Sequence, residues 1–148
     1  MPKRTTWTYD DGGRSNYFTA EHVGDCVTRA IAIGTGMDYK EVYDLIRQYS
    51  KKERVSKRKR GISNPRDGVY KQTFHKLLAD LGWKWIPTMR IGSGCTVHLN
   101  PDEWGSGTYI ISCSKHLTCM VDNVIHDTYD PSRGGTRCVY GYFLKEGA

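Results

Sequence analysis

The sequence lacks a long hydrophobic run. No stretch of about eighteen consecutive apolar residues occurs among its 148 residues, so we expect no membrane-spanning helix. Residues 1–7 are basic at their start but have no apolar segment behind them, so no signal peptide is expected. These two absences predict a cytoplasmic protein.

The sequence also lacks a Cys-X-X-Cys pair and an even number of cysteines. Its five cysteines are Cys26, Cys95, Cys113, Cys119 and Cys138. An odd number without close pairs argues against a disulfide framework and favours a reducing compartment. A chain of this length can bury about 68–70% of its unfolded surface without such cross-links, so we expect one domain over residues 1–148.

No pattern for a phosphate loop or a metal site is convincing. Gly92-Ser93-Gly94 is too short for a phosphate loop, because the Gly-Lys-Ser/Thr that should follow is missing. Cys113, His116 and Cys119 have an even, zinc-like spacing. On one strand, however, both cysteines point away from His116, so they could share an ion only if the chain bent near residues 114–115. We therefore expect neither metal nor cofactor.

Positive charge is concentrated in one segment. The chain carries 22 Lys and Arg against 16 Asp and Glu, and the densest basic run is residues 51–60. Gly, Ser, Asn and Pro follow it, which is typical of a solvated loop, here residues 51–67. The alternative is contact with nucleic acid or an acidic protein through phosphate or carboxylate groups. The run holds no aromatic residue that could stack on bases.

Hydrophobic periodicity predicts helices first and strands afterwards. Residues 1–24 are polar and turn-rich and are expected to form an N-terminal arm. Helices are predicted at about 26–35, from Asp38 as N-cap with Glu41 as its capping-box partner, and at 69–81. Strands are predicted at 83–87, 96–99, 108–113, 116–121, 124–129 and 137–143. This order indicates an α+β domain with the N-terminal helices packed on a C-terminal antiparallel sheet.

Cys26 is the strongest candidate for a functional residue. It follows the turn-forming pair Gly24-Asp25 and opens the first predicted helix. The free N–H groups and the positive dipole end of a helix stabilise a thiolate, which is the nucleophilic form of cysteine. His116 lies about ninety residues later and Asp127 follows it, an order that suits a nucleophile, its base and an acid that orients the base.

The predicted hairpin selects the acid that would serve His116. With a two-residue turn at 122–123, Asp127 lies opposite Thr118, which shares a face of the sheet with His116. Asp130 falls on the other face. A slip of one residue would reverse this choice.

A cysteine that opens the first long helix, a histidine that begins a later strand and an acid on the next strand resemble the papain-like superfamily. That superfamily includes bacteriocin-leader peptidases, transglutaminase-like proteins and amidase domains. The resemblance begins at about Gly24, and residues 127–142 are also similar to small uncharacterised bacteriophage-encoded proteins, which would place the protein in the host cytoplasm. The papain-like resemblance implies that Cys26 is the nucleophile, His116 the base and Asp127 the orienting acid.

One position departs from the papain-like pattern. These enzymes often carry a glutamine about six residues before the cysteine, where it stabilises the oxyanion, and this chain has Ala20 there. Oxyanion stabilisation would then come from the Cys26 backbone N–H and a second donor such as Asn16 or His22.

The resemblance implies a cysteine hydrolase that cleaves a peptide, isopeptide or amide bond through a thioester at Cys26. Passing the same acyl group to an amine would make the protein a transglutaminase-like acyltransferase. A third reading is a papain-like binding module without catalysis, which uses its basic loop for nucleic acid or an acidic partner. Cys95 is a weaker nucleophile candidate, because the residues after it are strand-like and give no helix dipole.

Overall fold

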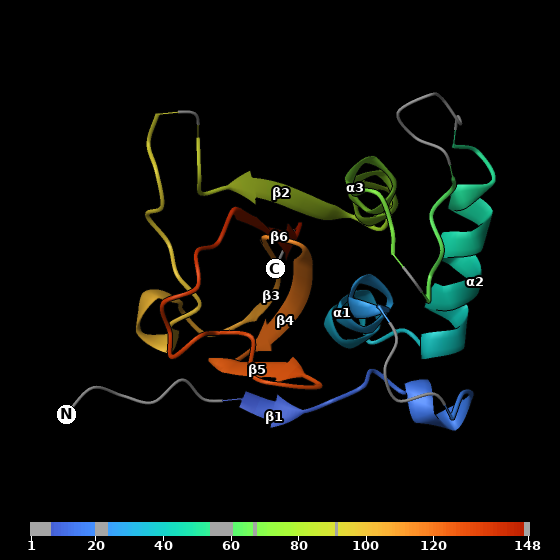
Figure 1. The fold of residues 1–148 in the computed structure, drawn as a ribbon, viewed down its shortest axis with the longest axis horizontal. Helices are drawn as coiled ribbons and strands as arrows, with labels where there is room; N and C mark the ends of the chain where they lie inside the picture. Colours follow the sequence, from blue (N-terminus) through green and yellow to red (C-terminus); the bar gives the residue numbers. More distant parts are fainter. Residues whose placement is uncertain (1–6, 20–23, 54–60, 67, 91, 147–148) are drawn as a thin grey trace.

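Three helices and a six-stranded sheet make up the described part of the chain (Figure 1). The computed structural model describes residues 7–19, 24–53, 61–66, 68–90 and 92–146. The helices are α1 (Cys26–Thr35), α2 (Tyr39–Ser50) and α3 (Lys71–Asp80), and two short 3-10 helices are η1 (Arg14–Asn16) and η2 (Pro101–Glu103). The strands are β1 (Trp7–Tyr9), β2 (Trp83–Pro87), β3 (Thr108–Cys113), β4 (His116–Val121), β5 (Val124–Asp127) and β6 (Gly141–Lys145). The predicted α+β class is confirmed.

The sheet is mixed rather than antiparallel. Its strand order is β1-β5-β4-β3-β6-β2, and every neighbouring pair is antiparallel except β1 and β5, which run parallel. The sequence-based expectation of an antiparallel sheet was therefore wrong at this edge, where part of the predicted arm forms β1. All three β1 residues are exposed, so no alternation of polar and apolar residues marks the strand.

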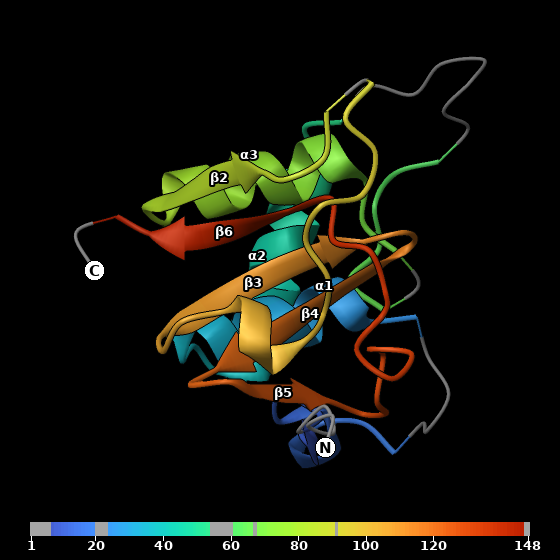
Figure 2. The same ribbon diagram turned by 90° about the vertical axis from the view of Figure 1, so that its left-hand side faces the viewer.

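The helices cover one face of the sheet, as Figures 1 and 2 both show. Fully buried side chains from α1, α2, α3 and β3 form the core between the layers, among them Ile31, Val42, Leu77 and Ile110. Gly34 lets α1 approach the sheet closely, because a Cβ there would lie 2.6 Å from the Ile110 side chain. This close packing fixes the position of α1, and with it Cys26, against the central strands.

Long loops cover the opposite face of the sheet. A second buried cluster lies there and includes Leu99, Ile111, Met120, Ile125 and Val139. The strand predicted at 96–99 is reduced to a single bridge between His98 and Cys138, so that prediction was wrong. The strand predicted at 137–143 is shifted and begins only at Gly141, where the ring of Trp85 fills the space that a side chain would need.

The helix ends follow the predictions closely. Helix α1 has the predicted bounds, and α3 begins at Lys71, two residues later than expected. Asp38 is the N-cap of α2, but its side chain makes no cap hydrogen bond and its carboxylate accepts one from the Tyr17 hydroxyl at 2.6 Å. The predicted capping box with Glu41 is therefore wrong, because Tyr17 occupies the Asp38 carboxylate.

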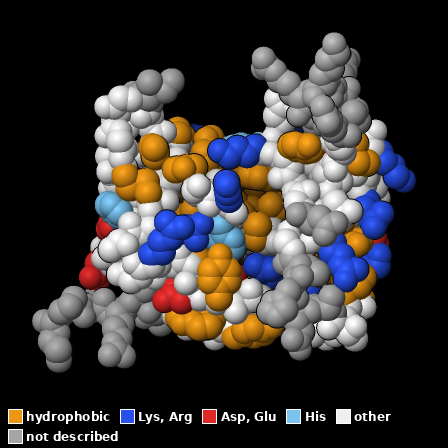
Figure 3. All heavy atoms as spheres, in the orientation of Figure 1, with side chains coloured by type: hydrophobic (Ala, Val, Ile, Leu, Met, Phe, Trp, Pro, Cys, Tyr) orange, Lys and Arg blue, Asp and Glu red, His pale blue; other side chains and the backbone are white. Residues whose placement is uncertain are grey.

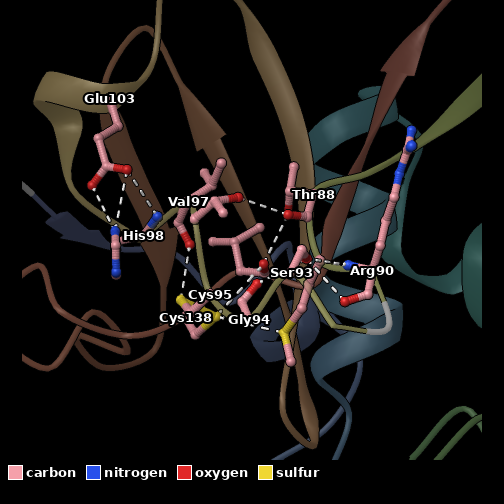
Figure 4. Close-up of a disulfide and its surroundings, with 12 residues drawn as sticks. Thr88, Arg90, Ser93, Gly94, Cys95, Val97, His98, Glu103 and Cys138 are labelled. Atoms are coloured by element: carbon pink, nitrogen blue, oxygen red, sulfur yellow. Dashed lines mark hydrogen bonds and ion pairs between the residues drawn. A yellow bond between two sulfur atoms is a disulfide. The ribbon is translucent and has the colours of Figure 1, made fainter.

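A disulfide joins Cys95 and Cys138, whose Cα atoms lie 5.8 Å apart (Figure 4). Val97, His98 and Glu103 lie on one side of it and Thr88, Ser93 and Arg90 on the other (Figure 4). The expectation of no disulfide was wrong, because partners separated by 43 residues leave no spacing signal in the sequence. The same bond removes the argument from cysteine number for a reducing compartment.

Two expectations concern other parts of the chain. No helix among the described residues is long and apolar enough to cross a membrane, as predicted. Residues 54–60 and 67 of the predicted basic loop lie outside the described residues.

Candidate active site

Cys26 is the first residue of α1, and its side chain is partly buried. Asp25 occupies the N-cap position and Gly24 precedes it at the surface. The N–H groups of the first helical turn have no partner within the helix, so they present partial positive charge around the sulfur. The local sequence thus places the thiol where a negative charge is stabilised.

His116 is the first residue of β4 and lies next to Cys26 at the N-terminus of α1. A tight turn at Ser114 and Lys115 joins β3 to β4, and Lys115 has a φ of 53°. The His116 side chain is only 6% exposed, and its Nε2 atom lies 2.7 Å from an Asp127 carboxylate oxygen. The bond to Asp127 occupies Nε2 and leaves Nδ1 for other partners, and the Tyr129 hydroxyl lies 3.5 Å from Nδ1. The His116 side chain also shares a hydrogen bond with the Cys26 thiol.

Asp127 ends β5 and receives four hydrogen bonds. His116 Nε2 and the Thr118 hydroxyl donate to Oδ2, both at 2.7 Å. The Thr128 backbone N–H and the Arg29 guanidinium donate to Oδ1, at 2.7 and 3.2 Å. Every hydrogen-bonding direction of the carboxylate is therefore occupied by a donor.

The predicted hairpin register is confirmed. Residues 122 and 123 form the turn with φ values of 47° and 68°, and Val121 pairs with Val124. The two-residue turn with positive φ at both positions matches the twist of the strands. Asp130 instead accepts hydrogen bonds from Ser132, away from His116, so the register selects Asp127 as predicted.

Asp127 belongs to a buried network of charged side chains. The Arg29 guanidinium bridges Asp127 and Asp25, and Arg14 donates to Asp25 at 3.0 Å. The Tyr39 hydroxyl also donates to Asp25, at 2.7 Å. The Asp25 side chain is fully buried, so removing either arginine would leave a carboxylate with a missing partner in a low-dielectric environment.

The thiol of Cys26 is more acidic than an ordinary cysteine. Burial opposes its ionisation, but the hydrogen bond with His116, the charge of that ring and the backbone N–H of Leu117 outweigh burial and lower the pKa from 9.0. Burial likewise opposes the charge on His116, but Asp127 and Cys26 raise its pKa above 6.5. The two shifts together favour a thiolate–imidazolium pair.

The other free cysteines behave in the opposite way. Burial raises the pKa of Cys113 to about 11 and raises that of Cys119 as well. Both remain neutral thiols at physiological pH. Cys26 is therefore the free cysteine among the described residues whose environment favours the nucleophilic form.

Cys26 and His116 open onto a cleft of about 300 Å³ between α1, α3 and the turn from β3 to β4. Its lining consists of Gly24, Cys26, Val27, Gly68, Val69, Lys71, Phe74, Ser112, Cys113, Lys115, His116 and Leu117. Figure 3 shows a hollow near the middle of this face, with hydrophobic and basic side chains around it. A substrate in the cleft would reach the sulfur and the imidazole together.

Of the two predicted side-chain oxyanion donors, Asn16 is the one that the structure describes. Asn16 ends η1 and is exposed, and it is not among the described residues that line the cleft. His22 lies outside the described residues. The Cys26 backbone N–H remains the predicted donor that the structure places at the site.

Two alternatives to the Cys26 site were weaker from the sequence, a nucleophile at Cys95 and a zinc-like set of residues. Cys95 is held in the disulfide, so it is no free nucleophile. No group of His, Cys, Asp or Glu residues in the described ranges could hold a metal ion, which applies to the spaced set of Cys113, His116 and Cys119.

Most of the support around the site has little signal in the sequence. The pair of Arg29 and Asp25 is the exception, because a spacing of four residues at the start of a helix favours an ion pair. Arg14 approaches Asp25 from a separate short helix, and no local pattern predicts this contact. The Leu117 N–H is a backbone group that every residue carries, so its role follows only from the geometry.

Comparison of the chain with protein-family models, with curated proteins and with solved structures found no match. The function is therefore inferred from the site itself. The informative features are the position of Cys26, its two partners and the cleft in front of them.

Proposed function

We propose that the protein is a papain-like cysteine hydrolase that cleaves a peptide, isopeptide or other amide bond. The observation that carries this proposal is the hydrogen-bonded series Cys26, His116 and Asp127 at the N-terminus of α1, in front of a cleft. A nucleophile, a base in contact with it and an acid that orients the base are the elements of covalent acyl-transfer catalysis. Their placement on a first helix, a strand and the next strand agrees with the papain-like resemblance.

In the first half of the reaction, the Cys26 thiolate attacks the carbonyl carbon of the amide and forms a carbon–sulfur bond. The carbonyl electron pair moves to oxygen, where the backbone N–H at the start of α1 stabilises the negative charge. The His116 imidazolium then gives its proton to the leaving nitrogen, and the carbon–nitrogen bond breaks. The products of this half are a free amine and a thioester on Cys26.

In the second half, neutral His116 takes a proton from water, and the resulting hydroxide attacks the thioester carbon. The carbon–sulfur bond breaks and returns its electron pair to sulfur. The products are a carboxylic acid and the original thiolate–imidazolium pair. Proton and charge balance are restored without a cofactor.

Asp127 keeps His116 in the productive orientation. Its carboxylate oxygen accepts a hydrogen bond from the Nε2–H group at 2.7 Å, so the ring cannot rotate without losing a charge-assisted bond. Thr118, Thr128 and Arg29 fix the carboxylate in turn. With Nε2 bonded to Asp127, Nδ1 is the ring nitrogen that can serve Cys26.

The experiment that tests this proposal is acetylation by p-nitrophenyl acetate, followed by mass spectrometry of the protein. We expect one acetyl thioester on Cys26, no thioester in Cys26→Ala, and normal labelling in the matched control Cys113→Ala. Cys113 lines the same cleft but its pKa is about 11, so it should not react. Equal labelling of Cys26→Ala and the parent protein would refute the proposal.

A further inference from the structure

The cleft at Cys26 continues into two neighbouring hollows. One, of about 390 Å³, shares Lys71 with the cleft and is lined by Lys71, Trp85, Pro87, Met89, Arg90 and Tyr140. The other, of about 540 Å³, shares Gly68 and Val69 with the cleft and also contacts Ile62, Asn64 and Tyr70. Each hollow adjoins the cleft through residues of the segment 68–71, and the three hollows together are called the substrate groove below.

A cleft with a nucleophile and two adjoining hollows offers more room than one bond needs, and such a surface fits an extended polypeptide. A small amide would need only the middle section of about 300 Å³. The two outer hollows would instead receive substrate residues beyond the bond that is cleaved. Binding energy from such remote residues holds the reacting carbonyl in place.

The substrate groove is basic. Lys71, Arg90 and Lys115 line it, and none of the described residues along its walls is acidic. Within the described part of the chain, these three cations form no ion pair with a carboxylate. The whole chain carries a net charge of +6, so the field outside the groove also attracts anions.

Lys71 is held at the junction between the cleft and the hollow that contains Arg90. Its ammonium lies over the ring of Tyr140, 5.4 Å from the ring centre. Trp85 forms the floor beside it, packed over Gly141, where no side chain fits. The hollow thus offers two cations beside aromatic and apolar surface, a setting for an acidic side chain with hydrophobic neighbours.

We propose that the substrate is an extended polypeptide with an acidic side chain on the Lys71 side of the cleaved bond. This inference rests on the proposed function for the role of Cys26. The carboxylate of that substrate side chain lies between Lys71 and Arg90, and the neighbouring substrate residues contact Trp85 and Met89. The chain of the substrate then crosses Cys26 and leaves along Val69 and Gly68.

Binding to the Cys26→Ala variant tests this proposal without any reaction. The probe is an equimolar pool of synthetic decapeptides in matched pairs that differ only by Glu or Gln at one position. The immobilised variant is exposed to the pool, and the retained peptides are quantified by mass spectrometry. We expect the Glu members to be enriched about fivefold at low salt, because two partly exposed ion pairs each contribute a modest amount.

The groove cations are tested by a second substitution in the same background. Lys71→Met keeps the alkyl chain but removes the charge, and together with Arg90→Met it should abolish the enrichment. Lys84→Met removes an exposed charge that lines none of the three hollows and should leave the enrichment unchanged. Equal retention of Glu and Gln peptides, or enrichment that survives loss of Lys71 and Arg90, would overturn the proposal.

Two further outcomes separate this proposal from its alternatives. Displacement of bound peptide by a single-stranded oligonucleotide at a lower concentration than by the free peptide would identify a nucleic-acid groove and overturn it. Acetylation of Cys26 by p-nitrophenyl acetate reports on the proposed function alone. A reactive Cys26 with no preference for acidic peptides would leave the hydrolase in place and overturn only the substrate class.

Discussion

Replacing Asp127 with asparagine removes one negative charge from a carboxylate that receives four hydrogen bonds. An asparagine side chain offers one acceptor oxygen and one NH2 donor group in place of the two carboxylate oxygens. If the NH2 group faces His116, the ring must accept through Nε2 and carry its proton on Nδ1, toward Cys26. That tautomer is neutral and cannot take the proton of the thiol.

The size of the effect follows from the lost interaction. The hydrogen bond and charge of Asp127 raise the pKa of His116, and His116 lowers the pKa of Cys26. Asp127→Asn should therefore lower the pKa of His116 and raise that of Cys26. The equivalent change in serine enzymes costs about ten-thousandfold in turnover. A thiol ionises more readily than a hydroxyl, so we expect a loss on the order of ten- to a hundredfold in Cys26 reactivity.

The assay is the rate of Cys26 alkylation by iodoacetamide, measured by mass spectrometry at several pH values, with about pH 6 as the decisive point. Asp130→Asn is the matched control, because Asp130 bonds only Ser132 in the described structure and is exposed. Circular dichroism would establish that both variants are folded. A larger loss in Asp130→Asn than in Asp127→Asn would refute the reasoning, as would an unchanged pH profile in Asp127→Asn.

Three further predictions concern the support of the fold. Arg29→Met should lower the free energy of unfolding by about 3 kcal/mol in a urea titration, because it leaves buried carboxylates without their partner; an unchanged midpoint would contradict this. Cys95→Ser should lower the free energy of unfolding by about 4 kcal/mol under oxidising conditions, the chain-entropy value for partners 43 residues apart. A reductant should destabilise the parent protein by a similar amount and leave the variant unaffected. Gly141→Ala should lower the melting temperature, at a cost of about 1–3 kcal/mol, because its Cβ would lie 2.3 Å from the Trp85 ring; the control Gly105→Ala meets only an ordinary contact at 3.7 Å and should change little.

The parts of the site that depend on local rules could be predicted from the sequence. The turn at residues 122–123 sets the register of its hairpin, and that register places Asp127 beside Thr118 and His116. The helix start at Cys26 follows from the Gly24-Asp25 turn and the apolar spacing after it. Both the hairpin register and the helix start are determined by residues that are close in the sequence, so both can be predicted from it.

The parts that depend on distant segments could not be predicted. Strand β1 pairs in parallel with β5 across more than a hundred residues, and its three exposed residues show no alternation. The ion pair between Arg14 and Asp25 joins a short 3-10 helix to the start of α1, and the disulfide joins two loops. In each case the contact is set by how whole elements pack, which neither spacing nor composition reveals.

The most direct measurement of the central claim is a titration of the Cys26 thiolate by ultraviolet absorbance, taken as the difference between the parent protein and Cys26→Ser. The hydrogen bond and charge of His116 lower the pKa of Cys26 from 9.0, and Cys26 helps to raise that of His116 from 6.5, so the thiolate signal of the parent should have its midpoint below 9.0. In His116→Ala the thiolate signal should appear only at a higher pH. A parent signal that first appears near 9.0, with the same midpoint in His116→Ala, would contradict the account.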